Sequence, residues 1–195
     1  MPVARCRIQR APSQFGLPTF DAQRVCYYYV RLFRYPGLLL DRFSKAQLEE
    51  GFWAIQGPNL SCSVFWLIWN LDLPFEDRQE CVRSMVDLFG GLFANEPLGT
   101  SVQMWWDSLC YEWHCGNRNR QRGGDDLSMQ DVMFETLTTL LALDSEICQD
   151  AALHGLGHLH HHGTEELIQS YMAQQSCLPK KRREYALAAA KFEVR

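Results

Sequence analysis

The sequence predicts an all-α protein, and three observations lead to that prediction. Helix-capping residues recur in front of apolar stretches, apolar residues recur at the spacing of amphipathic helices, and the signals of β-hairpins are missing. No Asn-Gly or Asp-Gly dipeptide separates two alternating runs, as a tight hairpin would require. With 195 residues, 47% of them apolar and 22% charged, the chain is long enough to bury a core as a single domain.

The first three predicted helices are defined by the residues at their ends. The first is expected over residues 21–34 and stops at residues 35–37, because the Tyr-Pro-Gly sequence there does not continue a helix. The run Ser44–Gln47 is a capping box that opens the second helix, and Gly57-Pro58 closes it. The third, Val64–Trp69, is apolar on nearly every side, so we expect it to be buried on nearly every side.

The fourth predicted helix begins at Pro74, reaches about Ala94 and is the most clearly amphipathic segment of the chain. Its apolar residues fall on one broad face. The opposite face carries the carboxylates of Glu76, Glu80 and Asp87. This acidic stripe is either a solvated surface or a face that binds a basic partner.

A predicted helix over residues 100–115 and a polar loop over residues 116–126 contain further candidate binding residues. These candidates are Trp105 and Trp106 in the helix and Arg118, Arg120 and Arg122 in the loop. The tryptophans would favour association with a partner if they were exposed at an open end of the fold. The arginines alternate with amide side chains and could bind a phosphate or a carboxylate, while a mobile surface loop is the alternative.

Four more helices are predicted in the remainder of the chain. Ser128 caps a helix over residues 129–143, and a short break leads into a second one over residues 146–160. A third is expected over residues 164–175, and Pro179 opens the last one. The chain therefore carries eight or nine helices, with many connections too short for anything other than antiparallel neighbours.

Residues 129–176 resemble HEAT repeats. One helix is followed by a tight turn at residues 143–145, and the next contains the run Ala-Ala-Leu-His-Gly-Leu-Gly-His-Leu over residues 151–159. That run is similar to the second helix of such repeats, in which small residues let paired helices approach closely. The resemblance implies antiparallel helix pairs stacked as a short α-solenoid with a concave binding surface. It divides the chain into an extended N-terminal arm, residues 1–20, and one helical-repeat domain, residues 21–195.

Five of the six histidines lie within residues 154–162. On a helix, Asp150, His154, His158 and His161 fall within about 80° of one another, beside the apolar stripe. His154 and His158 could chelate one divalent metal ion, with His161 or Asp150 as the third ligand. The resemblance offers an alternative, because the second helix of a HEAT repeat lines the concave face. There His154 and His158 would contact a partner protein.

The charge distribution favours a protein partner and argues against nucleic acid. Residues 41–150 contain seven basic and eighteen acidic side chains, whereas both ends of the chain are net basic. An acidic middle repels a phosphate backbone and attracts a basic protein. No apolar run approaches the roughly 20 residues of a membrane span, and the N-terminus does not resemble a secretory signal. These features predict a soluble cytoplasmic protein whose eight cysteines stay reduced.

The sequence lacks recognisable enzymatic motifs. It contains no Gly-rich phosphate loop, no Gly-x-Ser-x-Gly elbow and no His-Glu-x-x-His. We therefore expect a non-catalytic interaction module without a cofactor, such as an adaptor, a regulatory protein or an immunity protein that inhibits a toxin. It would bind another protein through its concave or acidic face. The alternative expectation is a metal-binding helical protein or a metalloenzyme that uses Asp150, His154, His158 and His161.

Overall fold

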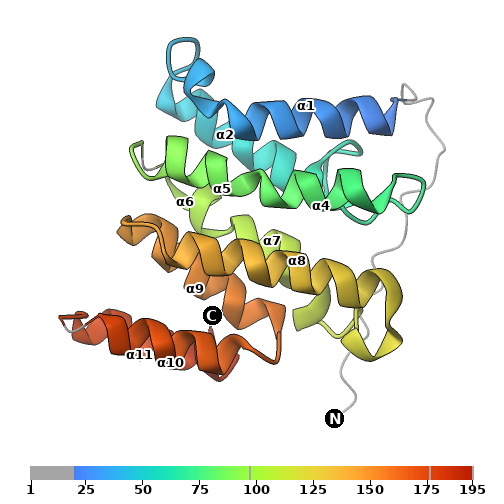
Figure 1. Ribbon diagram of the computed structural model, residues 1–195. Helices are drawn as coiled ribbons and strands as arrows, with labels where there is room; N and C mark the ends of the chain where they lie inside the picture. Colours follow the sequence, from blue (N-terminus) through green and yellow to red (C-terminus); the bar gives the residue numbers. More distant parts are fainter. Residues whose placement is uncertain (1–19, 97, 176, 195) are drawn as a thin grey trace.

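The computed structural model describes residues 20–96, 98–175 and 177–194, and these residues form helices and loops without a strand (Figure 1). The all-α prediction is confirmed. The arm expected over residues 1–20 lies outside the described residues, apart from Phe20. None of the described helices is both long enough and apolar enough to cross a membrane.

The helices follow one another with mostly short connections. The N-terminal half contains α1 (Ala22–Arg34), the 3-10 turn η1 (Pro36–Leu39), α2 (Lys45–Gln56), α3 (Val64–Leu67), α4 (Phe75–Arg83), α5 (Met85–Leu88) and the π-helical turn η2 (Phe89–Phe93). The C-terminal half contains α6 (Thr100–Gln103), α7 (Trp105–His114), the 3-10 turn η3 (Arg120–Arg122), α8 (Gly124–Leu141), α9 (Glu146–Leu159), α10 (Thr164–Gln174) and α11 (Lys180–Ala190).

Side-chain caps fix the starts of three helices. The carboxylate of Asp21 accepts a hydrogen bond from the backbone N–H of Arg24 at 3.0 Å, which opens α1. Ser44 and Gln47 form the predicted capping box at the start of α2. Ser145 accepts a hydrogen bond from a backbone N–H in the first turn of α9. Each cap satisfies a backbone donor that has no partner inside its helix.

Two predicted helices are interrupted. The helix expected from Pro74 to about Ala94 is divided at Ser84, whose hydroxyl donates to the Cys81 carbonyl at 2.8 Å. Such a bond competes with the backbone ladder of the helix. The helix expected over residues 100–115 is divided at Met104, whose backbone angles (φ −87°, ψ 2°) depart from helical values.

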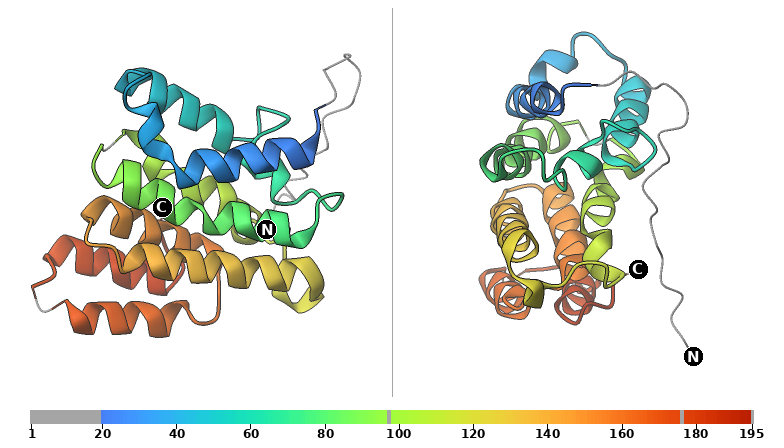
Figure 2. Two further views of the ribbon diagram at one scale, coloured as in Figure 1. Left: turned by 45° about the horizontal axis from the view of Figure 1, so that its top comes forward. Right: turned by 90° about the vertical axis from the view of Figure 1, so that its right-hand side faces the viewer.

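The helices lie in two rows, as the end-on view in Figure 2 shows. In one row α1, α4, α8 and α10 pack one after another, and in the other row the order is α2, α7, α9 and α11. The central helix is α9, which packs against α7, α8 and α11. Every residue from Ala151 to Leu159 is buried. Because α9 is enclosed on several sides, its polar side chains His154 and His158 are buried with the apolar ones.

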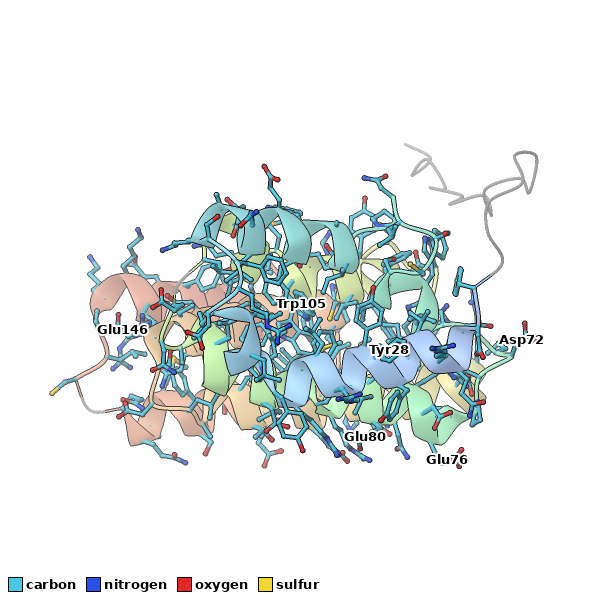
Figure 3. The ribbon with its side chains drawn as sticks, turned by 90° about the horizontal axis from the view of Figure 1, so that it is seen from above. Tyr28, Asp72, Glu76, Glu80, Trp105 and Glu146 are labelled. Carbon is cyan, nitrogen blue, oxygen red and sulfur yellow. The ribbon has the colours of Figure 1, made fainter. Side chains whose placement is uncertain are left out.

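Aromatic rings fill the centre of the N-terminal part. The ring of Trp105 meets Phe33 and Phe52 edge to face, with centroids 5.7 Å and 6.0 Å apart, and Figure 3 shows it in the interior between α1 and α2. The neighbouring Trp106 packs against Gly155 of α9. Both indoles are fully buried, since α7 has neighbours on both sides. This corrects the expectation that the two tryptophans bind a partner: they belong to the core.

The cysteines of the core behave as small apolar residues. Cys26, Cys81, Cys110 and Cys148 are buried, and all of them are free thiols. Burial raises the pKa of the Cys110 thiol well above its ordinary value, so this side chain stays neutral. Buried among apolar neighbours, these free thiols pack as small apolar side chains.

Candidate metal centre

A cluster of ionisable side chains lies where α7 and α9 pack together. Asp107 and His114 come from α7, two helical turns apart, so they share one face of that helix. His154 and His158 come from the opposing face of α9, one turn apart. Close packing of the two helices therefore brings four side chains from distant parts of the sequence into one small volume.

Three of these side chains point donor atoms at a common point. The Nε2 atom of His158 is 3.1 Å from Oδ1 of Asp107, and Nε2 of His154 is 3.9 Å from the same oxygen. All three donor atoms lie within 4.8 Å of one another. In a tetrahedral zinc site with bonds of about 2.0–2.1 Å, ligand atoms are about 3.3 Å apart. Small side-chain rotations would therefore let all three donors reach a single cation.

The other ring nitrogen of each histidine has its own partner. Nδ1 of His154 lies 2.6 Å from the hydroxyl of Tyr185 on α11, and Nδ1 of His158 lies 3.1 Å from Nδ1 of His114. If Nε2 binds a cation, Nδ1 carries the proton and donates it to these partners. Metal-ligating histidines generally use their second nitrogen in this way, which fixes both the tautomer and the ring orientation.

Both histidines are held in the neutral form that binds metals. His154 is 9% exposed and His158 is 5% exposed. Burial lowers the pKa of His154, in spite of the opposing effect of Asp107. Burial, together with the neighbouring imidazoles, lowers the pKa of His158 to about 4. Burial also raises the pKa of Tyr185 to about 12, so its phenol remains protonated at neutral pH.

One atom of the cluster has no hydrogen-bond partner. Among the described residues, Nε2 of His154 is fully buried and unsatisfied, because the Asp107 oxygen at 3.9 Å is too far for a hydrogen bond. A buried polar atom without a partner costs about 1–3 kcal/mol. Coordination of a cation would satisfy this atom while keeping the Tyr185 contact on the other side of the ring.

A cleft of about 790 Å³ reaches this cluster from the side of α11. His154 and Tyr185 line it, and Met104 contributes from the start of α7. Arg182 also lines the cleft and pairs there with Asp150 at 2.9 Å. The cluster is thus buried but borders a space that is large enough for a small molecule.

The structure brings together a different set of candidate side chains from the one predicted. His154 and His158 do converge, but the sequence-predicted Asp150, one turn before His154 on α9, forms an ion pair with Arg182 of α11. Instead, Nε2–H of His161 donates to the Asp131 carboxylate at 3.0 Å, Nδ1 accepts from the Gly163 N–H, and the ring stacks on Phe134. The third donor is Asp107, which sequence reasoning missed.

The acidic stripe remains on the surface. Glu76 and Asp87 are exposed, and Glu80 forms an ion pair with Arg34 of α1. Figure 3 shows Glu76 and Glu80 on the outer side of the molecule. These positions are accessible to a partner, although part of the charge of Glu80 is already neutralised within the protein.

The three candidate arginines of the polar loop have carboxylate partners inside the protein. Arg118 pairs with Asp126 at 2.8 Å and lies over the Trp69 ring. Arg120 pairs with Asp131. Arg122 lies 3.8 Å from the Asp126 carboxylate and donates to the backbone carbonyl of Asn117. The ion pairs with Asp126 and Asp131 hold the loop against the first turns of α8.

Comparisons with known proteins do not assign the chain to a family. No protein-family model matches it, and no curated protein or solved structure matches it either. The function is therefore inferred from the geometry of the cluster itself.

Proposed function

We propose that this protein binds one divalent transition-metal ion between α7 and α9, with Asp107, His154 and His158 as ligands. The observation that carries the proposal is the orientation of the two imidazoles. The imidazoles of His154 and His158 both direct Nε2 toward Asp107. Their Nδ1 atoms form hydrogen bonds with Tyr185 and His114, respectively. Two imidazoles and one carboxylate suit zinc, and also cobalt, nickel or iron in the divalent state.

A hydrogen-bonded polar core is the competing explanation of the cluster. It accounts for the contact between His158 and Asp107 at 3.1 Å. It does not account for His154, whose buried Nε2 atom faces the same carboxylate without reaching it. A cation between the three donors explains all three orientations, and this difference favours the metal site.

The stacked rows of helices support a role for the metal in holding the fold together. We propose that the two rows form a short HEAT-like solenoid, in which α7 and α9 belong to successive layers of the same row. A metal bridging these helices would link the two layers. It would add its binding free energy to the stability of the folded chain.

Metal titration of purified, metal-stripped protein tests the proposal. Zinc should bind at one ion per chain and raise the unfolding temperature, and His154→Ala with His158→Ala should abolish both effects. Asp107→Asn should weaken binding strongly, because it removes the anionic ligand.

Two control variants separate this site from other ways of binding zinc. Asp150→Asn should leave zinc affinity unchanged, because Asp150 pairs with Arg182. His162→Ala should also leave it unchanged, since His162 is an exposed member of the same histidine run. Loss of binding in the His162 variant, with binding intact in the Asp107 variant, would show adventitious capture by the histidine run and would refute the proposal.

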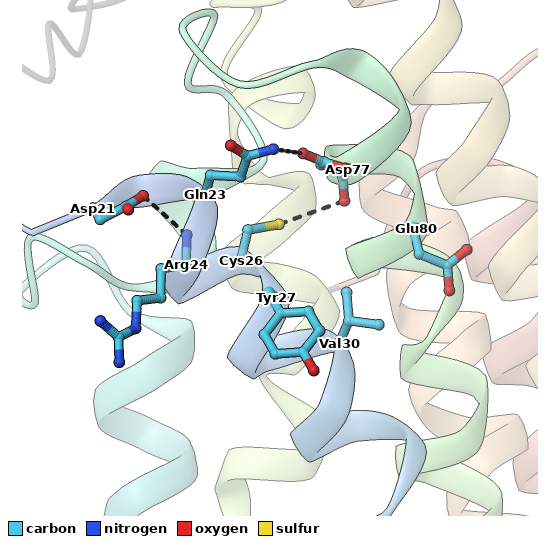
Figure 4. A pocket seen from close by; sticks show the side chains of 8 residues that line it. All are labelled: Asp21, Gln23, Arg24, Cys26, Tyr27, Val30, Asp77 and Glu80. Carbon is cyan, nitrogen blue, oxygen red and sulfur yellow. Dashed lines mark hydrogen bonds between the residues drawn. The ribbon is translucent and has the colours of Figure 1, made fainter.

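A second candidate function, binding of another protein, rests on the surface around α1. Among the described residues, twelve large apolar side chains are exposed, and seven of them lie within residues 20–43. They are Phe20, Tyr27, Tyr28, Tyr35, Leu38, Leu40 and Phe43. Exposed aromatic residues concentrated in one region are typical of interaction sites. Tyr27 also lines a groove of about 440 Å³ between α1 and α4, together with Asp77 and Glu80 (Figure 4).

An adaptor, regulatory or inhibitory role would use this α1 surface together with the acidic residues next to it. The Tyr27→Ala and Tyr35→Ala double variant should then lose a partner that the wild-type protein captures from its host. Leu187→Ala is the control, because Leu187 is also an exposed apolar residue (44%) but lies on α11. Equal loss of capture in the control would mean that exposed apolar area in general, rather than the α1 surface, binds the partner.

A further inference from the structure

We propose that Cys26 of α1 and Cys81 of α4 form a dithiol that hydrogen peroxide, entering through the groove between these helices, oxidises to a reversible disulfide. The inference is independent of the proposed metal site. Three features of the structure support it: the contact between the two thiols, the groove beside Cys26, and the difference between the surroundings of the two sulfur atoms.

The two thiols lie together where α1 packs against α4. The S–H group of Cys26 donates to the backbone carbonyl oxygen of Asp77 at 3.4 Å. By the bonding pattern of an α-helix, that carbonyl also accepts from the backbone N–H of Cys81, so Cys26 reaches the turn of α4 that carries Cys81. The Cys81 thiol in turn forms a hydrogen bond with the Cys26 sulfur. A disulfide requires two sulfur atoms that already lie close together.

Cys26 is the thiol that a small oxidant can reach. It lines the groove of about 440 Å³ between α1 and α4, where Figure 4 shows it beside Asp77. Only 2% of Cys26 is exposed, which excludes large reagents, whereas hydrogen peroxide is little larger than water. Cys81 is fully buried and does not line the groove. The first attack on peroxide therefore comes from Cys26.

The surroundings of the two sulfur atoms give them different roles. The hydrogen bond from Cys81 lowers the pKa of the Cys26 thiol, and the positive charge of Arg78 acts in the same direction, against the effects of burial and of Asp77. The same hydrogen bond, together with complete burial, raises the pKa of Cys81 well above its ordinary value. The thiolate, rather than the thiol, is the nucleophile. Cys26 is therefore the attacking sulfur and Cys81 the resolving one.

The oxidation proceeds in two balanced steps. The Cys26 thiolate attacks one oxygen atom of hydrogen peroxide: an S–O bond forms, the O–O bond breaks, and the leaving hydroxide takes up the proton lost by Cys26 to become water. The Cys81 thiol then gives up its proton and attacks the sulfur of the Cys26 sulfenic acid. The S–S bond forms, the S–O bond breaks, and the leaving hydroxide takes up that proton as a second water. The two thiols lose two electrons, which reduce the peroxide.

The disulfide would join α1 covalently to α4. The exposed rings of Tyr27 and Tyr28 lie on α1, next to Cys26 in the sequence. Oxidation would therefore hold in place the helix that carries these exposed aromatic residues.

Peptide mapping of peroxide-treated protein tests this inference. Trypsin cleaves after lysine and arginine, which places Cys26 in residues 25–31 and Cys81 in residues 79–83, each as the sole cysteine of its peptide. After peroxide treatment and blocking of the remaining thiols, the two peptides should appear linked and two hydrogen atoms lighter than their sum. Dithiothreitol added before the blocking step should abolish the linked species. Cys110, a fully buried thiol with a raised pKa, is the internal control and should still take up the blocking group on denaturation.

Two serine variants separate the roles of the two thiols. In Cys81→Ser the sulfenic acid has no resolving thiol, so the sulfenic-acid reagent dimedone should label Cys26 in this variant and not in the wild type. In Cys26→Ser, Cys81 should stay reduced at the same peroxide concentration. A wild-type protein without the linked peptides would overturn the inference, and equal oxidation of Cys81 in wild type and Cys26→Ser would overturn the assigned roles. Linked peptides that form only together with oxidation of Cys110 would show that unfolding exposes the thiols, and would also overturn it.

Discussion

Gly155 of α9 lies directly against Trp106 of α7. A methyl group built on Gly155 would come within 2.6 Å of Trp106 Cβ and 2.8 Å of Leu137 Cδ2. Carbon atoms in ordinary contact are about 3.5–4.0 Å apart. The absence of a side chain at this position therefore sets how closely α7 and α9 approach each other, and that approach places His154 and His158 opposite Asp107.

The Gly155→Ala variant should consequently be less stable than the wild type. Overpacking at a rigid helix contact costs about 1–3 kcal/mol, and here it should also lower zinc affinity, because it separates the two helices that carry the ligands. Urea denaturation and zinc titration measure the two effects. Gly51→Ala is the matched control. A Cβ on Gly51 would meet nothing within 4 Å, and alanine there should stabilise α2 by about 0.5–1 kcal/mol. An unchanged midpoint for Gly155→Ala would contradict the close approach.

Hydrogen bonds from Glu49 of α2 hold the segment that leads into α6. Its carboxylate accepts hydrogen bonds from the backbone N–H groups of Gly99 and Ser101, both at 2.8 Å, and from the Ser101 hydroxyl at 2.7 Å. Glu49→Gln should lower the free energy of unfolding by about 1–3 kcal/mol, because an amide offers one acceptor oxygen and no charge. The exposed Glu50 on the same helix provides the control, and Glu50→Gln should have little effect. Equal stability of the two variants would show that these bonds contribute nothing.

The same carboxylate should make stability depend on pH in the acid range. Burial alone would raise the pKa of Glu49, but the hydrogen bonds from Ser101 and Gly99 outweigh it and hold that pKa below its ordinary value of 4.5. The unfolded chain then takes up a proton before the folded one does. The stabilisation from Glu49 is therefore present above pH 4.5 and is lost as the pH falls through the lower pKa of the folded state. Denaturation below pH 5 should show a shallower decline in stability with falling pH for Glu49→Gln than for the wild type.

The histidine cluster should destabilise the metal-free protein as the pH falls below neutrality. In the folded state the pKa of His158 is about 4, against an ordinary value of 6.5. Between these two values the unfolded chain binds a proton that the folded chain excludes, so acidification favours unfolding. The loss should amount to up to about 3 kcal/mol between pH 7 and pH 4. His158→Gln should flatten this part of the profile, and a wild-type profile that is already flat there would contradict the neutral, buried imidazole.

Local signals in the sequence predicted much of the fold and two of the three ligands of the proposed metal site. The Tyr-Pro-Gly stop after α1 and the capping box of α2 define these helix ends without knowledge of the tertiary structure. The spacing of His154 and His158 placed them on one face for the same reason. The resemblance to HEAT repeats implied that small residues within 151–159 allow a close helix contact, and Gly155 lies in such a contact.

The remaining features depend on which helices meet. Asp107 carries no motif of its own, and only the packing of α7 on α9 brings it to the histidines. Asp150 shares a helix with them, but Arg182 from α11 pairs with its carboxylate. The burial of Trp106 similarly follows from the neighbours of α7, since an aromatic residue suits a core and an interface equally well.

Anomalous diffraction at the zinc absorption edge, from crystals of the zinc-loaded protein, tests the central claim most directly. The account predicts one strong peak between α7 and α9, about 2.0–2.1 Å from Nε2 of His154, Nε2 of His158 and a carboxylate oxygen of Asp107. A zinc-loaded crystal with its peak at the exposed imidazoles of His160 or His162, and none between these helices, would contradict it.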